Sequence, residues 1–165
     1  MIDKLIILFV LTLVPIFELR WSIPIGLFSK EINVPFIGMI PGFGLNPFTV
    51  FIVCVLANIL LGMVAYFFFD KIIHLFRRIK LIDDFYDTFS KKTHKKVHPL
   101  VEKYGLIGMA LFIAIPLPGS GSWTGALAGN LLDFGYKRFF IANAIGVIIS
   151  GTIVTLLSLG IFFFL

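Results

Sequence analysis

Two long uncharged apolar stretches constrain this sequence more than any other feature. Residues 47–69 and residues 139–165 contain no Asp, Glu, Lys or Arg over 23 and 27 positions. As helices they would be about 35 and 40 Å long, which exceeds the hydrocarbon core of a bilayer, about 30 Å. Asn46 and Pro47 suit the N-cap and the first turn of the first helix. We therefore predict two membrane-spanning helices.

Composition supports the same class of protein. Of the 165 residues, 59% are hydrophobic and only 14% are charged, whereas a soluble domain has about 25% charged residues. A fold of this size cannot bury that excess of apolar surface, so part of it must face lipid. We expect an all-α integral membrane protein, with residues 1–165 forming a single membrane domain.

The basic residues predict the topology. Eleven of the 14 Lys and Arg residues lie in two segments, residues 71–103 and residues 137–138. Cytoplasmic loops of membrane proteins carry the Lys and Arg excess, so we expect both segments on the cytoplasmic side of the cell membrane and both termini outside. Nucleic-acid binding is the alternative explanation of the positive charge. The basic cluster is short and flanked by apolar segments, which argues against a nucleic-acid partner.

Two further apolar segments are too short to cross a bilayer. Residues 5–14 and residues 106–115 each end before a proline after ten positions, which is about 15 Å of helix. Helix-breaking stretches follow them at residues 15–24 and residues 116–125, and each of these leads into a second short apolar piece. This pattern is typical of re-entrant hairpins. The predicted hairpins span about residues 5–28 and about residues 106–130.

The order of segments suggests an inverted repeat. Residues 1–69 and residues 105–165 each contain a predicted hairpin followed by one span, and residues 70–104 join them. If each half crosses the membrane once, the second half must be inverted, which places both basic segments on one face. In the linker, apolar residues recur at spacings of three and four between Ile72 and Phe89, which predicts a basic amphipathic helix. That helix would extend the span, contact anionic lipid or only fix the topology.

Glu18 and Arg20 are the sharpest candidates for function. Placing an ionisable group at membrane depth costs about 3 kcal/mol on insertion scales, unless the group is paired or faces a polar cavity. A desolvated Glu18 can take up a proton and so couple transport, and Arg20 can hold an anionic headgroup or carboxylate. The alternative is that both residues lie near the interface and anchor the hairpin. Because they are two positions apart, a mutual ion pair requires a chain that is not regularly helical there.

The second broken segment carries hydroxyls and glycines instead of charges. A half-helix that begins near Ser122 would direct free N–H groups into a polar cavity, with Ser120 and Thr124 adding hydroxyls. The alternative is a close-packed helix junction. Asn58 and Asn143 lie inside the two spans, where they either join the site or form interhelical hydrogen bonds.

No residue pattern indicates an enzyme, a cofactor or a metal. The serines have no nearby histidine in sequence, and the three histidines lie in the polar linker without a second cluster at metal-ligand spacing. Cys54 lies in an apolar run, so we expect it to pack in the helix interface without a chemical role.

Two stretches carry a family resemblance. ELRWSIP (residues 18–24) and IPLPGSGSWTG (residues 115–125) resemble the signature stretches of the small multidrug export protein family, which is similar to the wider DedA (SNARE-associated, VTT-domain) superfamily. The resemblance covers essentially the whole chain and implies two re-entrant hairpins and membrane transport. Its Glu and Arg match Glu18 and Arg20. Its proline and glycine positions match Pro24, Pro116, Pro118, Gly119, Gly121 and Gly125.

One departure separates the chain from the DedA pattern. The pair of arginines that follows the second hairpin in that superfamily has only Lys137 and Arg138 nearby. The wider superfamily implies lipid-phosphate handling or proton-coupled export, and the missing arginine pair argues against carrying the lipid-phosphate role over to this chain.

These observations predict a proton- or ion-coupled transporter that exports or translocates a small or amphipathic substrate through two facing hairpins. The alternatives are a lipid-phosphate flippase or scramblase of DedA type and a structural membrane scaffold. The expected partners are membrane lipids, a small-molecule or lipid substrate, protons and a second copy of the chain. The candidate site for substrate or coupling ion comprises Glu18, Arg20, Pro24, Asn58, Pro116, Pro118, Gly119, Ser120, Gly121, Ser122, Trp123, Thr124, Gly125 and Asn143.

Overall fold

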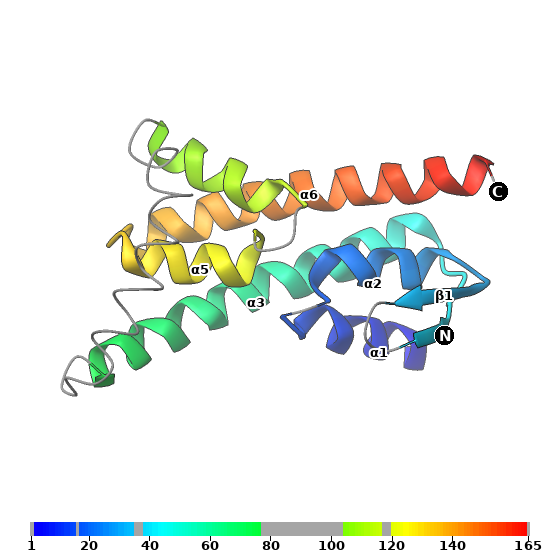
Figure 1. Ribbon diagram of the computed structural model, residues 1–165, viewed down its shortest axis with the longest axis horizontal. Helices are drawn as coiled ribbons and strands as arrows, with labels where there is room; N and C mark the ends of the chain where they lie inside the picture. Colours follow the sequence, from blue (N-terminus) through cyan, green and yellow to red (C-terminus); the bar gives the residue numbers. More distant parts are fainter. Residues whose placement is uncertain (1, 16, 35–37, 77–103, 117–119, 165) are drawn as a thin grey trace. The chain divides into compact units, whose positions relative to one another are not determined.

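The computed structural model describes residues 2–15, 17–34, 38–76, 104–116 and 120–164 (Figure 1). Six helices and one two-stranded sheet lie in these residues. The chain forms two compact units. Unit 1 contains Met1–Leu60 and Val147–Leu165, and unit 2 contains Leu61–Gly146.

The two longest helices confirm the two predicted apolar spans. Helix α3 (Pro47–Phe76) and helix α6 (Tyr136–Phe164) contain the segments Pro47–Ile72 and Tyr136–Gly160, with mean hydropathies of 2.6 and 2.1. Both segments are long and apolar enough to cross a membrane by length and composition. Each helix also continues past its uncharged stretch into charged residues.

The start of α3 follows from its sequence. The Asn46 Oδ1 atom accepts a hydrogen bond of 2.9 Å from the Phe48 N–H, which satisfies one of the otherwise unpaired donors of the first turn. Pro47 follows at the first helical position, where its missing N–H costs nothing. The predicted N-cap is therefore confirmed.

The first broken segment consists of two short helices in unit 1, α1 (Ile2–Leu13) and α2 (Glu18–Leu27). We expected a helix-breaking stretch over residues 15–24, and that expectation was too wide. The helix resumes at Glu18 and contains Pro24. A proline inside a helix removes one N–H donor without ending the helix, and the next turn closes with a 2.9 Å bond from the Phe28 N–H to the Pro24 carbonyl.

A β-hairpin that the sequence analysis did not predict joins α2 to α3. Strand β1 (Glu31–Val34) pairs antiparallel with β2 (Gly38–Pro41), and Ile32 lies opposite Ile40. These two isoleucines and Phe43 pack against Phe17 and Ile25, so the hairpin covers one apolar face of α2. The prediction of an entirely helical chain was therefore wrong for this connection.

Unit 2 contains the second pair of short helices, Tyr104–Ala114 and α5 (Ser122–Leu131). The predicted half-helix beginning near Ser122 is confirmed. A tight turn with positive φ at Asp133 (47°) and Gly135 (81°) then leads directly into α6. The order of two short helices followed by a long helix thus occurs twice along the chain.

Some predictions are not tested by this fold. Residues 77–103, which include most of the predicted amphipathic linker helix, lie outside the described residues, although α3 continues as far as Phe76. The inverted orientation of the second half and the re-entrant path of the short helices stay predictions.

Candidate functional site

One face of α2 is built for close packing inside unit 1. Glu18, Ser22 and Gly26 recur at intervals of four and are all buried, so they form a single stripe along the helix. A Cβ atom on Gly26 would lie 2.8 Å from Val50 Cγ1 and 3.2 Å from Leu8 Cδ2. The stripe therefore faces the groove between α1 and α3.

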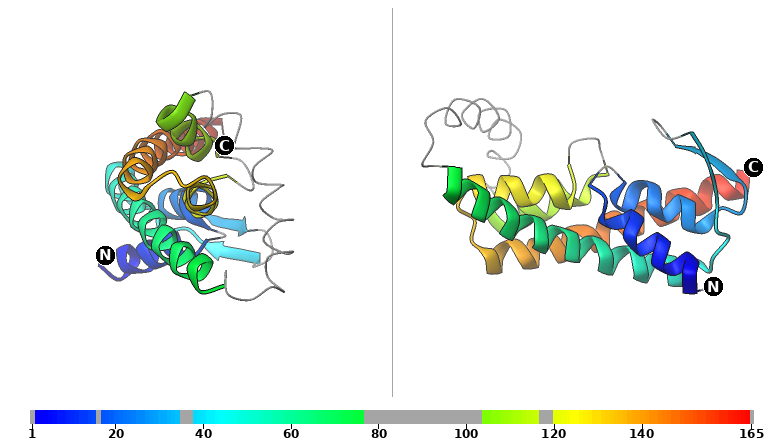
Figure 2. Two further views of the ribbon diagram at one scale, coloured as in Figure 1. Left: turned by 90° about the vertical axis from the view of Figure 1, so that its left-hand side faces the viewer. Right: turned by 90° about the horizontal axis from the view of Figure 1, so that it is seen from below.

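The partner stripe on α3 has the same spacing. Val50, Cys54 and Asn58 are all buried, and the first half of α3 runs antiparallel to α2 (Figures 1 and 2). Starting from the Gly26–Val50 contact, each step of four residues advances about 6 Å along both helices. This register places Ser22 opposite Cys54 and Glu18 opposite Asn58.

An independent contact supports the register. Thr12 lies one turn beyond Leu8 on α1, and its side chain interacts with the Cys54 thiol. Its hydroxyl also donates a 2.8 Å hydrogen bond to the Leu8 carbonyl. One turn along from the Gly26–Val50 contact, Thr12, Ser22 and Cys54 therefore lie at the same height on α1, α2 and α3. One turn further, Glu18 lies at the height of Asn58.

Glu18 has an unusual backbone conformation and a buried side chain. Its φ is +42°, a left-handed conformation that costs a non-glycine residue about 1–3 kcal/mol. Its N–H donates a 3.1 Å bond to the Val14 carbonyl, and the side chain is 5% exposed. Such strain in a buried acidic residue is typical of functional sites.

Glu18 and Arg20 both lie in the first turn of α2. The two side chains interact electrostatically, and the helix starts irregularly at Glu18, as a pairing at this spacing requires. Arg20 is half-buried.

Several buried oxygens lack a hydrogen-bond partner. Within the described residues, five buried side-chain atoms have no partner, and all five are oxygens. An amide oxygen accepts only, so it needs a hydrogen-bond donor or a cation beside it. In unit 1 these atoms are Ser22 Oγ, Asn58 Oδ1 and Thr155 Oγ1, and in unit 2 they are Ser122 Oγ and Asn143 Oδ1.

The two unit 2 oxygens lie on facing helices. A Cβ on Gly125 would lie 2.7 Å from Ile113 and 3.8 Å from Phe139 on α6. Ser122 lies one turn before Gly125, and Asn143 lies one turn after Phe139. Because α5 and the first part of α6 are antiparallel in Figures 1 and 2, Ser122 and Asn143 lie at the same level.

The other predicted residues of the second segment have local roles. The Ser120 hydroxyl donates to the Ile115 carbonyl, and the Thr124 hydroxyl donates a 3.4 Å bond to the Gly121 carbonyl. Gly121 has a φ of +111°, which only glycine adopts easily. The Trp123 ring lies 4.9 Å from the ring of Phe69. Ser122, with its fully buried and unpartnered hydroxyl, is thus the hydroxyl that the local backbone does not use.

The remaining candidates divide as follows. Pro24 lies within α2 and is half-buried, and Pro116 follows the helix Tyr104–Ala114. Pro118 and Gly119 lie outside the described residues. In unit 1, Glu18 interacts with Arg20, and the helix register puts Glu18 near the level of Asn58. In unit 2, the same reasoning puts Ser122 near the level of Asn143. That these residues form one substrate or ion site stays a prediction.

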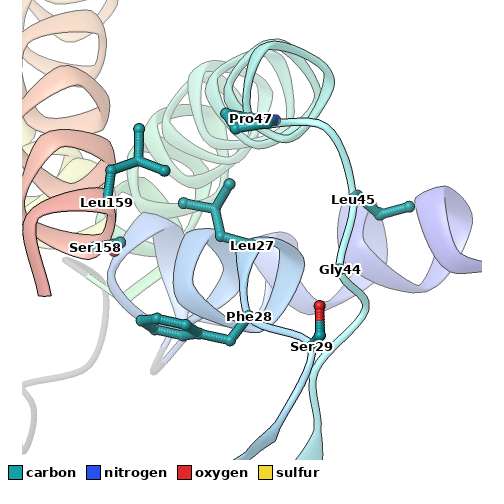
Figure 3. A pocket seen from close by; sticks show the side chains of 8 residues that line it. All are labelled: Leu27, Phe28, Ser29, Gly44, Leu45, Pro47, Ser158 and Leu159. Atoms are coloured by element: carbon teal, nitrogen blue, oxygen red, sulfur yellow. The ribbon is translucent and has the colours of Figure 1, made fainter. Parts of the chain in front are cut away.

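A separate cavity lies at the start of α3 in unit 1 (Figure 3). It has a volume of about 160 Å³ and a mostly apolar lining, to which Ser29 and Ser158 add hydroxyls. It lies beside Pro47, about 16 Å along α3 from Asn58, so it is not part of the Glu18 site. Its lining consists of Leu27, Phe28, Ser29, Gly44, Leu45, Pro47, Ser158 and Leu159.

The sequence analysis missed two polar residues of unit 1. Ser22 and Thr155 have buried hydroxyls without a partner. Ser22 had a detectable signal, since it lies one helical turn after Glu18 and so shares its face. Thr155 had none, because hydroxyls in apolar helices usually bond the backbone one turn earlier, as Thr152 does with the Ile148 carbonyl.

Comparisons with known proteins add one identification. No curated protein matches the chain, and no solved structure matches it. Residues 18–153, which include α2, α3, α5 and most of α6, match the family model described as "Putative small multi-drug export protein". The wider DedA similarity is not shown by these comparisons and stays a prediction. Because the match covers most of the chain, the protein belongs to this small multi-drug export family.

Proposed function

We propose that the protein is a membrane exporter in which Glu18 couples substrate movement to a proton or another small cation. The observation that carries this proposal is the buried Glu18 carboxylate at a strained helix start, opposite an amide oxygen that has no hydrogen-bond partner. Membership of an export family and two apolar helices support the membrane location. The substrate is a small or amphipathic molecule, as the family description suggests.

The depth of each hairpin supports a re-entrant path. In unit 1, the register places the start of α2 level with Asn58, which is near the middle of the segment Pro47–Ile72. In unit 2, the start of α5 is level with Asn143, about 10 Å inside α6. Both helix starts therefore lie well inside the apolar segments, as expected for hairpins that enter and leave on the same side.

The chemistry of Glu18, Arg20 and Ser122 suggests a different role for each residue. Glu18 supplies an exchangeable negative charge, and Arg20 supplies a permanent positive charge beside it. Ser122 and the first N–H groups of α5 supply hydrogen-bonding groups without charge. We propose that exchange of the cation at Glu18 alternates the access of the substrate path between the two sides of the membrane.

The direct test is transport by protein reconstituted into liposomes. Lipophilic cations and short-chain lipid phosphates are offered separately while an imposed pH gradient is varied. Gradient-dependent accumulation of a water-soluble or amphipathic substrate supports coupled export. Movement of lipid phosphates without any gradient dependence would favour passive translocation, and the absence of all transport would favour a scaffold.

The topology gives a separate prediction. Lys92→Cys and Lys137→Cys, each in a Cys54→Ser background, should both be labelled by a membrane-impermeant thiol reagent from the cytoplasmic side only. The reason is that eleven basic residues are confined to residues 71–103 and 137–138. Labelling of the two positions from opposite sides would mean that the second hairpin crosses the membrane, which contradicts the re-entrant path.

Arg20 gives a prediction about substrate recognition. Arg20→Lys keeps the positive charge but loses the planar fork that binds a carboxylate or phosphate through two hydrogen bonds. We expect affinity for an anionic substrate group to fall about tenfold with little change in folded yield, measured as the half-saturating substrate concentration of transport. Full activity of Arg20→Lys together with an inactive Arg20→Gln would show that only the charge matters.

A further inference from the structure

The cavity beside Pro47 has the volume of a small ring compound. Residues from the end of α2, from the start of α3 and from α6 surround it (Figure 3). Its volume of about 160 Å³ is close to that of an engineered protein cavity of about 150 Å³ that binds benzene. The space therefore fits one aromatic ring with a small substituent.

The walls of this cavity carry no charge. Among the described residues that line it, none is Asp, Glu, Lys or Arg. Lys4 lies outside the lining, where its Nζ donates a 3.0 Å hydrogen bond to the Phe43 carbonyl, next to Gly44. An anion in the cavity would have no counter-charge within the walls, and a cation would be repelled by Lys4. The occupant that fits is therefore uncharged.

One backbone acceptor at the wall is left without a donor. The last four carbonyls of a helix have no partner within that helix. In α2, three of them accept bonds of 2.8 or 2.9 Å from the N–H groups of Phe28, Phe43 and Leu45. The fourth, the carbonyl of the lining residue Leu27, accepts none of the backbone bonds in the described part of the chain. A carbonyl only accepts, so a ligand that satisfies it must carry a hydrogen-bond donor.

Two hydroxyls complete the polar part of the lining. Ser158 of α6 is only 4% exposed, and Ser29 follows the end of α2. A Cβ on Gly44 would lie 2.6 Å from Ser29 Oγ, so the glycine leaves room for this hydroxyl. A hydroxyl both donates and accepts, so each serine can bond an O–H group of a ligand.

We propose that the cavity binds a small uncharged aromatic alcohol, a molecule of the phenol class. The ring fills the apolar part of the cavity, beside Phe28 and Leu159. The O–H group donates to the Leu27 carbonyl and accepts from the serine hydroxyls. This site does not rest on the coupling role of Glu18, because the cavity lies about 16 Å along α3 from Asn58.

Binding is tested with 4-fluorophenol and with fluorobenzene, its analogue without the hydroxyl. Fluorine NMR spectra of each probe are recorded at pH 7 with increasing amounts of the purified protein in detergent, and the effect of empty micelles is subtracted. The phenolic O–H stays protonated, since its pKa is about 10. We expect saturable binding of 4-fluorophenol, about fivefold tighter than that of fluorobenzene.

Serine variants test the recognition of the hydroxyl. Ser29→Ala and Ser158→Ala should each weaken binding of 4-fluorophenol about threefold and leave fluorobenzene binding unchanged. Ser150→Ala is the matched control, because Ser150 is also a buried serine of α6 in unit 1 but does not line the cavity. It should bind both probes as the unaltered protein does.

A second pair of variants tests the location of the ring. Leu159→Trp places an indole where the ligand ring would lie, so it should abolish binding of both probes. Leu157→Trp is its control, because Leu157 is 59% exposed and does not line the cavity. Glu18→Gln should bind 4-fluorophenol normally, whether or not it transports.

The outcomes decide between these expectations. A lack of saturable binding beyond that of empty micelles would overturn the site, and so would unchanged binding by Leu159→Trp. Equal affinity for the two probes, with no effect of Ser29→Ala, would overturn the recognition of the hydroxyl. Should Ser158→Ala or Leu159→Trp not fold, Ser29→Ala decides, because Ser29 is exposed and lies outside the helices.

Discussion

Glu18→Gln is expected to lower pH-driven accumulation of substrate in proteoliposomes at least tenfold. The variant keeps the size of the side chain and one acceptor oxygen, but it cannot release a proton or carry a charge. When the proposed transport cycle exposes the Glu18 site to water, the glutamate can ionise, and when the cycle closes the site the carboxylate must bind a cation or pair with Arg20. Glutamine can neither ionise nor bind a cation through a charge, so the pH gradient cannot drive transport through this side chain.

The folded yield of Glu18→Gln should match that of the unaltered protein, because burying an amide costs less than burying a carboxylate. Glu18→Asp is the matched control, since it keeps the acid and shortens the side chain by one methylene. We expect it to retain part of the gradient dependence. Full gradient-driven accumulation by correctly inserted Glu18→Gln protein would remove Glu18 from the mechanism and favour passive translocation.

Gly62→Ala is expected to destabilise the folded protein by about 1–3 kcal/mol. A Cβ on Gly62 would lie 2.5 Å from Asn143 Nδ2 and 2.6 Å from its Oδ1, closer than real atoms approach. The Asn143 side chain lies in a buried interface and is fully buried itself. The added methyl group must therefore displace this amide or separate α3 from α6 within unit 2.

Gly160→Ala supplies the control for Gly62→Ala. Both glycines lie inside long helices, but nothing lies within 4 Å of the position of a Cβ on Gly160. Alanine is the better helix former, so this substitution should be neutral or slightly stabilising. Thermal unfolding in detergent compares the two variants, and equal melting temperatures would show that the Gly62 contact carries no weight.

The sequence predicted the elements whose signals are local. The uncharged apolar stretches identified α3 and α6, and the side chain of Asn46 caps α3 as its position suggested. The start of α5 at Ser122 followed from the glycines and prolines before it. Each of these signals acts within one or two helical turns, so a single sequence is sufficient to detect it.

The pairing of helices could not be predicted in this way. The contact of Gly26 with Val50 depends on how α2 packs beside α3. The placement of Glu18 opposite Asn58 follows from that contact, and no sequence spacing encodes it. Pro24 was misjudged because a proline stops a helix only where its missing hydrogen bond cannot be tolerated. The β-hairpin was missed because its four-residue strands are shorter than a recognisable alternating pattern.

The composition of the two units has a consequence for biosynthesis. Unit 2 is one continuous stretch of chain, Leu61–Gly146, whereas unit 1 joins Met1–Leu60 to Val147–Leu165. Proteins commonly fold from the N-terminus while they are being translated, but here the first 60 residues lack part of their packing surface until the last 19 are made. Gly151, for example, lies against Phe51 and Val55. A chain that stops before residue 147 would therefore contain all of unit 2 and all residues of the Glu18 site, but it would lack the part of α6 that packs against Phe51 and Val55 in unit 1.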